Sequence, residues 1–162
     1  MVALPGLADD RASGFASIMD HANAVLIEMV KEGTITADER ARMVLGAHPR
    51  RKAELLAPFA QDGQFEGLTV ENFDMSVLTD IAWTEYERDG NKDALATKHA
   101  LFFRSGFMPS LAGALTGVRA GDSEALKNFG DRLEHGLKRR VAREPAAMHS
   151  FVQTIVLAKQ SN

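Results

Sequence analysis

The apolar residues of this 162-residue chain recur at helical spacing in three long stretches. In the first stretch they fall three or four positions apart, which is typical of a helix with one apolar face, and Gly33 stands where that helix would end. A second helix is predicted over about Asp93–Leu115, and a third from a cap at Asp122 or Ser123 to about Glu144. The apolar positions of the first stretch are Phe15, Ile18, Met19, Ala22, Val25, Leu26, Met29 and Val30.

Two shorter helices are indicated by the residues at their ends. The sequence T-A-D-E at Thr36–Glu39 is a capping box, in which the Thr36 oxygen accepts from the backbone N–H of Glu39 and the Glu39 side chain reaches back. A short helix through Met43–Leu45 is expected to follow. Another helix is expected to begin with Pro49 at its first position, where a missing N–H costs little, and Pro58 predicts that it is short or kinked.

Three segments are predicted to be extended. Met1–Leu7 is a short apolar run and is expected to form a buried strand. Gly63–Leu78 approximates an alternation of apolar and polar residues, and His149–Gln160 is rich in β-branched residues, so each predicts a strand. Tyr86–Ala94 is charged and contains an Asp-Gly pair, which predicts a loop.

This order of strand, helices, strand, helices and strand predicts an α/β fold that is mostly helical and has few strands. The length is that of one domain, so residues 1–162 are expected to form a single domain. Because the first strand begins almost at residue 1, we expect further sheet to precede it.

Composition and charge argue against several kinds of binding partner and site chemistry. A net charge of −3 argues against a general nucleic-acid binder, which needs a basic surface to displace counterions. No stretch is apolar for about 20 residues, so no membrane-spanning helix is expected. The first residues lack the basic region and the long apolar run of a signal peptide, which predicts a cytoplasmic location. The absence of cysteine excludes disulfides, thiolate catalysis and thiolate metal sites.

The chain lacks the short motifs of dinucleotide, P-loop, serine-hydrolase and zinc-protease sites. Its histidines have no second histidine or carboxylate at the spacing of metal ligands, so we interpret them as polar surface residues and predict no metal site. The basic segment Leu137–Arg143 is interpreted as a solvated helix end, where the helix dipole favours cations. The five histidines are His21, His48, His99, His135 and His149.

The stretch Lys98–Leu115 carries apolar side chains on more faces than a simple surface helix needs. It includes Phe102, Phe103, Phe107 and Met108. These side chains fit a packed core, and a soft surface rich in aromatic residues and methionine can also line an apolar ligand pocket. The residues alone leave both explanations open.

Six segments, in this order, resemble the C-terminal half of the SABATH family. Members of that family are S-adenosylmethionine-dependent carboxyl methyltransferases that act on small carboxylic acids. Arg104 and Pro109 fall on an arginine and a proline of the family pattern. The six segments are MVALPGLA, NAVLIEMVKEGTITADE, GQFEGLTVENFDM, DIAWTEYERDG, FFRSGFMPSLAGAL and FVQTIVLAKQ.

The resemblance implies strands from the C-terminal part of a Rossmann-like methyltransferase sheet, with a helical cap over the substrate. The family's half that binds S-adenosylmethionine lies before the first strand of this chain. Its glycine-rich loop, its acidic ribose ligand and its substrate-binding glutamine are not in this sequence. We therefore expect this chain alone to lack the S-adenosylmethionine site, and we expect a small carboxylic acid as its ligand.

The resemblance also implies a substrate pocket. Its positions fall on Met19 beside Ile18, on His48, on Phe103, and on or next to Phe151. Most of these positions keep only their apolar character, so the acid differs from that of the plant enzymes. Because a carboxylate is already nucleophilic at neutral pH, the implied methyl transfer relies on positioning and desolvation, and no catalytic acid or base is assigned.

Two alternatives stay open. The chain could be a non-catalytic α/β remnant whose open strand edge pairs with a second copy in a homodimer or with a missing N-terminal half. It could also be a stand-alone pocket protein for an apolar acid.

Overall fold

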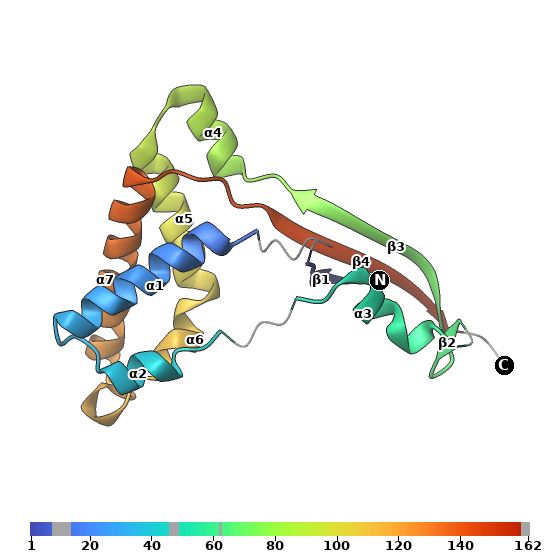
Figure 1. The fold of residues 1–162 in the computed structure, drawn as a ribbon, viewed down its shortest axis with the longest axis horizontal. Coiled ribbons are helices and arrows are strands. Elements are labelled where there is room, and N and C mark those ends of the chain that lie inside the picture. The colour runs from blue at the N-terminus through green and yellow to red at the C-terminus, as the bar shows by residue number, and fades with distance from the viewer. Residues whose placement is uncertain (8–13, 46–48, 62, 160–162) are drawn as a thin grey trace. The chain divides into compact units, whose positions relative to one another are not determined.

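The computed structural model describes residues 1–7, 14–45, 49–61 and 63–159, and it confirms a mixed α/β chain that is mostly helical (Figure 1). These residues form two compact units. The sheet unit comprises residues 1–15, 48–80 and 149–162, and the helical unit comprises residues 16–47 and 81–148. No helix in the described ranges is both long and apolar enough to cross a membrane.

The elements alternate between the two units along the chain. The strands are β1 (Val2–Pro5), β2 (Gln64–Phe65), β3 (Leu68–Leu78) and β4 (Ser150–Lys159). The helices are α1 (Ala16–Lys31), α2 (Ala37–Arg42), α3 (Lys52–Leu56), α4 (Ile81–Asp89), α5 (Lys92–Gly106), α6 (Met108–Ala112) and α7 (Ser123–Arg143), with short 3₁₀ turns η1 (Ala57–Phe59) and η2 (Gly117–Arg119).

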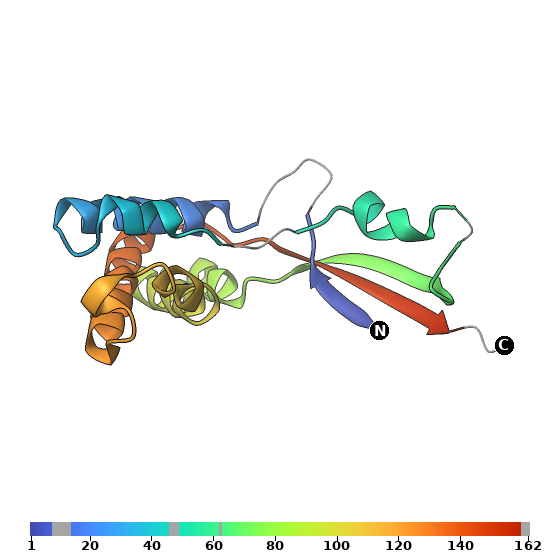
Figure 2. The same cartoon turned by 90° about the horizontal axis from the view of Figure 1, so that it is seen from below.

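The sheet unit is built on one four-stranded sheet with the order β1-β4-β3-β2. Every pairing in it is antiparallel, and β3 and β4 lie side by side along most of their length (Figures 1 and 2). Because β1 and β3 are each antiparallel to β4 between them, β1 and β3 point in the same direction. Strands β2 and β3 form a hairpin, whose turn residues Glu66 and Gly67 have positive φ angles of 52° and 75°.

The sheet unit buries few side chains. Among its described residues only Gln153 and Ile155 of β4 are buried. Gly6 lies so close to Gln153 that a Cβ would approach its Cγ to 2.7 Å. The strand predicted over Met1–Leu7 is confirmed at Val2–Pro5, but its four side chains are exposed because β1 is an edge strand.

The helical unit holds most of the core. Helix α5 packs along α7, and α1 lies across α7 (Figures 1 and 2). Gly136 permits the close crossing of α1 and α7, because a Cβ at this position would lie 2.6 Å from Cγ1 of Val25. The buried apolar residues of this unit are Ile18, Ala22, Val25, Leu26, Met29, Ile35, Leu95, Ala96, Ala100, Phe103, Leu111, Leu115, Phe129, Leu133, Leu137 and Val141.

The long helix predicted over Asp93–Leu115 is instead two helices. Helix α5 ends at Gly106, Phe107 leaves the helical conformation with φ −120°, and α6 begins at Met108. Pro109 has no backbone N–H and cannot continue the hydrogen-bond ladder of α5. The predicted helix was too long because the apolar spacing continues across this break.

Two other predicted boundaries were wrong. The charged loop is mostly helix: α4 extends to Asp89, Gly90 follows with φ 67°, and Asn91 caps α5 by accepting from the N–H of Ala94 at 3.0 Å. Pro49 does not begin a helix, since α3 begins only at Lys52. The carbonyl of Arg50, the residue after Pro49, accepts hydrogen bonds from Nε2 of Gln153 and from the backbone N–H of Leu7, and these hold the chain extended there.

Candidate functional site

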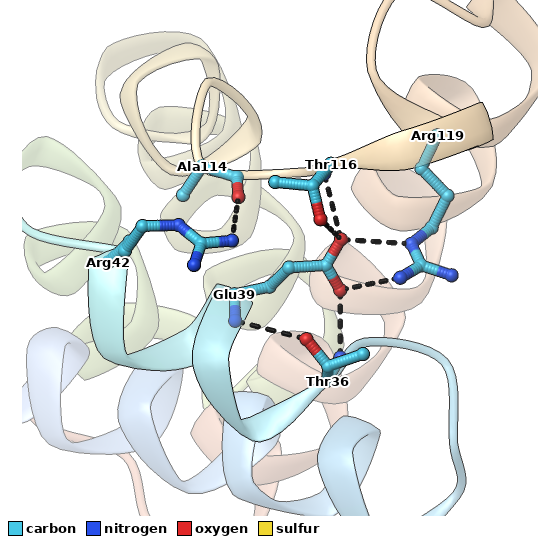
Figure 3. A network of polar contacts seen from close by, with 6 residues as sticks. All are labelled: Thr36, Glu39, Arg42, Ala114, Thr116 and Arg119. Carbon is cyan, nitrogen blue, oxygen red and sulfur yellow. Dashed lines mark hydrogen bonds and ion pairs between the residues drawn. The ribbon is translucent and has the colours of Figure 1, made fainter.

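A buried carboxylate, that of Glu39, is the most strongly perturbed acidic group among the described residues of the helical unit (Figure 3). Its Oε1 accepts from the backbone N–H of Thr116 at 2.8 Å, from the Thr116 hydroxyl at 3.0 Å and from Nε of Arg119 at 3.2 Å. Its Oε2 accepts from the N–H of Thr36 at 2.8 Å and from Nη2 of Arg119 at 2.7 Å. The predicted capping box is therefore confirmed, although α2 ends at Arg42.

This environment makes Glu39 a structural group. Burial raises the pKa of Glu39, but the hydrogen bonds from Thr36, Thr116 and Arg119 outweigh burial and lower the pKa from 4.5 to about 2. A carboxylate with five hydrogen bonds and such a low pKa is a poor proton acceptor. Glu39 instead links the first turn of α2 to the segment around η2, through its hydrogen bonds with Thr116 and Arg119.

Arg104, which falls on the family's arginine, also has a structural explanation. Its Nη1 donates to Asp131 Oδ1 and to Glu134 Oε2, both at 2.7 Å, and so links α5 to α7. Hydrogen bonds to these two carboxylates raise the pKa of Arg104. Gly130 faces the guanidinium: a Cβ at position 130 would lie 3.4 Å from Nη2 of Arg104, so the absence of a side chain there leaves room for the arginine.

Two histidines are buried in the helical unit, which corrects the prediction that the histidines are surface residues. His21 on α1 is 8% exposed and His99 on α5 is 2% exposed. His135 and His149 are exposed as predicted, and His48 lies outside the described residues. The two buried histidines come from different helices and line the same small hollow.

The hollow lies between α1, α5 and α7. It contains about 190 Å³ of space between atoms but has no room for a water molecule. Nε2 of His21 is buried and has no hydrogen-bond partner among the described residues. The lining residues are Ser17, Ile18, His21, His99, Val141, Glu144, Ala146 and Met148.

Of the pocket residues implied by the resemblance, only Ile18 is among the residues that line this hollow. Ile18 lines it, whereas Met19 is half-buried and is not among the lining residues. Phe103 is 1% exposed and packs in the core of the helical unit, with its ring 5.2 Å from that of Phe107. Phe151 lies half-buried on β4 of the sheet unit, and His48 is outside the described residues. Their roles as substrate contacts stay predictions.

Periodicity could have revealed the two buried histidines. His21 comes three residues after Ile18 and four before Val25, so it falls within the apolar stripe of α1. His99 comes four residues before Phe103 and likewise lies on the buried face of α5. A search for metal-ligand spacing misses both positions, because each histidine is alone on its helix.

The hollow is lined by both polar and apolar side chains. Within the part of the chain that the structure describes, no three histidine, aspartate or glutamate side chains gather to hold a metal ion. An imidazole and a serine hydroxyl can each donate a hydrogen bond. Apart from Ser17, the two histidines and Glu144, the lining side chains are apolar, and Glu144 is exposed and pairs with Arg143 at 3.0 Å. Because the hollow has no room for a water molecule, these groups form part of the packed core of the helical unit.

The basic end of α7 is engaged with acidic neighbours. Arg140 pairs with Glu28, and Arg132, which lies earlier in α7, donates to Glu32 at 2.9 Å. These pairs link α7 to α1 and to the residue that follows it, beside a groove of about 330 Å³. The charges of opposite sign are interspersed along this groove, which fits the interpretation of a solvated helix end and gives no strong anion-binding field.

The segments that carry the family resemblance fall in both units. MVALPGLA and FVQTIVLAKQ contain β1 and β4 of the sheet unit, whereas FFRSGFMPSLAGAL spans the end of α5 and all of α6 in the helical unit. In comparisons with known proteins, no family model matches the chain and no curated protein matches it.

Proposed function

We propose that the chain is the substrate-binding and cap portion of an S-adenosylmethionine-dependent methyltransferase that acts on the carboxylate of a small apolar acid. The order of the six SABATH-like segments along the chain carries this proposal. Their placement supports it, because the strand-like segments share one sheet and helix-forming segments lie in a separate helical unit.

The directions of the strands support a place in a Rossmann-like sheet. β1 and β3 point the same way, with β4 reversed between them. Doubly wound sheets that are otherwise parallel commonly carry an antiparallel strand. Apart from the isolated parallel bridge between Gly6 and Arg50 just after β1, the outer edge of β1 has no strand partner among the described residues, so further parallel strands could pair there.

The chemistry of the helical unit fits a reaction that needs little acid–base help. When bound, S-adenosylmethionine would supply an electrophilic methyl group. The bond from this methyl group to a carboxylate oxygen would form as its bond to sulfur breaks, releasing S-adenosylhomocysteine, and the carboxylate would lose no proton. The residues of this chain would bind the acid and exclude water. Glu39 is fully engaged in hydrogen bonds, so it does not compete for this role.

Calorimetric titration tests the binding part of this proposal. We expect benzoate, hexanoate or phenylacetate to bind the folded chain, and the neutral analogue benzamide to bind more weakly. We expect no heat from S-adenosylmethionine, because the residues that bind it in the family are not in this sequence. Tight binding of S-adenosylmethionine to this chain, or no binding of any of the three acids, would contradict the assignment.

A second candidate function is an interaction module that pairs through β1. The observation that favours it is the edge of β1, which has no strand partner among the described residues and where Val2 and Leu4 are 44% and 38% exposed. An exposed strand edge is a template for another strand. Light scattering would then give a dimer mass, and Leu4→Lys would give a monomer. A monomer mass for both proteins rejects pairing between copies.

A further inference from the structure

The starting observation is the outer edge of β3, the edge that faces away from β4. Strand β2 pairs with β3 only at Leu68 and Thr69, so beyond these two residues the outer edge has no strand partner among the described residues (Figure 1). No backbone hydrogen bond joins residues 71–78 to a described segment other than β4. Alternate residues of a strand direct their N–H and C=O groups to each edge, so this edge offers a row of hydrogen-bonding groups to another strand.

The side chains along this edge are also open to solvent. Of residues 71–78, all except Phe73 are exposed. Three large apolar side chains are among them, since Met75, Val77 and Leu78 are 39%, 55% and 52% exposed. Proteins usually protect a strand edge by keeping it short or by charging it, whereas this edge is long and carries only two carboxylates. It therefore has the character of a pairing surface.

The alternate residues Phe73, Met75 and Val77 lie on the face of the sheet that holds its small core. Phe73 is the partner of buried Ile155 on β4, and Met75 is the partner of buried Gln153. Paired residues of an antiparallel sheet share a face, and every second residue of a strand returns to it. A further strand beside β3 that carries apolar residues on this face would extend the core of the sheet unit.

The sequence of this edge is complementary to a second copy of itself. When two copies of a strand pair antiparallel about a two-fold axis, one residue faces its own copy and the others pair symmetrically around it. With Met75 on the axis, Phe73 of each copy faces Val77 of the other, so apolar residues meet on the apolar face. Asp74 then faces Ser76, and no two like charges are opposite. An axis at Asp74 would oppose two carboxylates, and an axis at Ser76 would pair fewer residues because β3 ends two positions later.

We propose that the protein forms a symmetric dimer through the outer edge of β3, with residues 72–78 of two copies paired antiparallel and Met75 on the two-fold axis. The two sheets join into one continuous sheet, whose apolar face runs across both copies. The edge of β1 lies at the opposite side of each sheet and stays open for the further strands that the proposed function places there. The interface is therefore distinct from pairing through β1, and it does not depend on the proposed function.

Disulfide cross-linking tests both the dimer and its register, because the chain has no cysteine of its own. Directly opposite residues of an antiparallel pair have Cα atoms about 4.5 or 5.5 Å apart, a separation that a disulfide spans. Met75→Cys should therefore give a covalent dimer under mild oxidation. Val77→Cys alone should not, because its own copy lies roughly 13 Å away along the strand. A mixture of Phe73→Cys chains and Val77→Cys chains should cross-link one kind to the other.

Sedimentation and light scattering measure the same dimer without a cross-link. We expect a dimer mass for the unmodified chain, and Met75→Lys should weaken dimerisation roughly tenfold or more, because two ammonium groups would face each other across the axis. Met75 is 39% exposed, so the folded chain should tolerate the lysine, and circular dichroism checks this. Leu4→Lys is the matched control, because Leu4 is 38% exposed on the opposite edge of the sheet, and it should leave the dimer mass unchanged.

The outcomes separate this inference from the other proposals. A monomer mass for the unmodified chain at every concentration would overturn the dimer. A dimer that Leu4→Lys dissociates and Met75→Lys does not would place the contact at β1, and equal cross-linking of Met75→Cys and Val77→Cys would contradict the register. A dimer lost with Met75→Lys and trapped by Met75→Cys supports the inference, whether or not the chain binds a carboxylic acid.

Discussion

Replacement of Glu39 by glutamine tests how the helical unit is held together. The pKa of about 2, against the ordinary 4.5, corresponds to a stabilisation of about 3 kcal/mol at neutral pH. The Arg119 side chain is 33% exposed, so solvent screens its share, and we expect Glu39→Gln to lower the free energy of unfolding by about 2 kcal/mol. Urea unfolding followed by circular dichroism at 222 nm measures this loss, because most helices lie in the helical unit.

The pH dependence identifies the charge as the cause. The folded pKa of Glu39 is depressed, so the stabilisation is present above the unfolded pKa of about 4.5 and is lost as the pH falls towards 2. The advantage of the unmodified chain over Glu39→Gln should be constant from pH 7 to about pH 5 and should shrink below that. Glu32→Gln is the control, since its side chain is 58% exposed and should contribute less than about 1 kcal/mol. A loss no larger than that of the control, or an advantage as large at pH 3 as at pH 7, would refute the reasoning.

Two further substitutions test the packing and the turn geometry. Gly136→Ala should lower the free energy of unfolding in urea by about 1–3 kcal/mol, because the new Cβ would lie 2.6 Å from Cγ1 of Val25. Gly106→Ala is the control: its Cβ meets no atom within 4 Å, so the substitution should be neutral or slightly stabilising. Equal effects of the two substitutions would contradict the close crossing of α1 and α7. Glu66→Asn should stabilise the hairpin by about 0.5–1 kcal/mol, because asparagine tolerates the positive φ that residue 66 adopts before Gly67. This stabilisation would appear as slower hydrogen exchange of the β3 amides. Faster exchange would count against a turn of this type.

Local patterns predicted the helices and strands well where one face is buried. The stripe from Ile18 to Met29 gave α1, and the capping box at Thr36 and Glu39 gave the start of α2, because both signals depend on neighbouring residues only. The positions where helices end were harder to predict, because they depend on single residues that interrupt the apolar spacing. Phe107 ends α5 where apolar residues still recur at helical spacing, so the break could not be read from spacing.

The candidate site was harder to predict, because its residues meet only after the helices pack. His21 and His99 are 78 positions apart in the sequence, and each looks like a lone polar residue. Their burial follows from the helical phase of their neighbours, and the spacing of metal ligands carries no information about that phase. The donors to Glu39 from Thr116 and Arg119 also come from a distant segment, so the capping box alone gave no sign of the ion pair.

The most direct test of the proposed function is methyl transfer by the native protein. The protein is captured from its source cells with an antibody raised against the 162-residue chain, and it is supplied with small apolar acids and S-adenosylmethionine carrying a deuterated methyl group. Mass spectrometry then searches for deuterated methyl esters. We predict an ester of at least one acid, formed only with the captured protein. Captured protein that binds S-adenosylmethionine and these acids but forms no ester would contradict the proposed function.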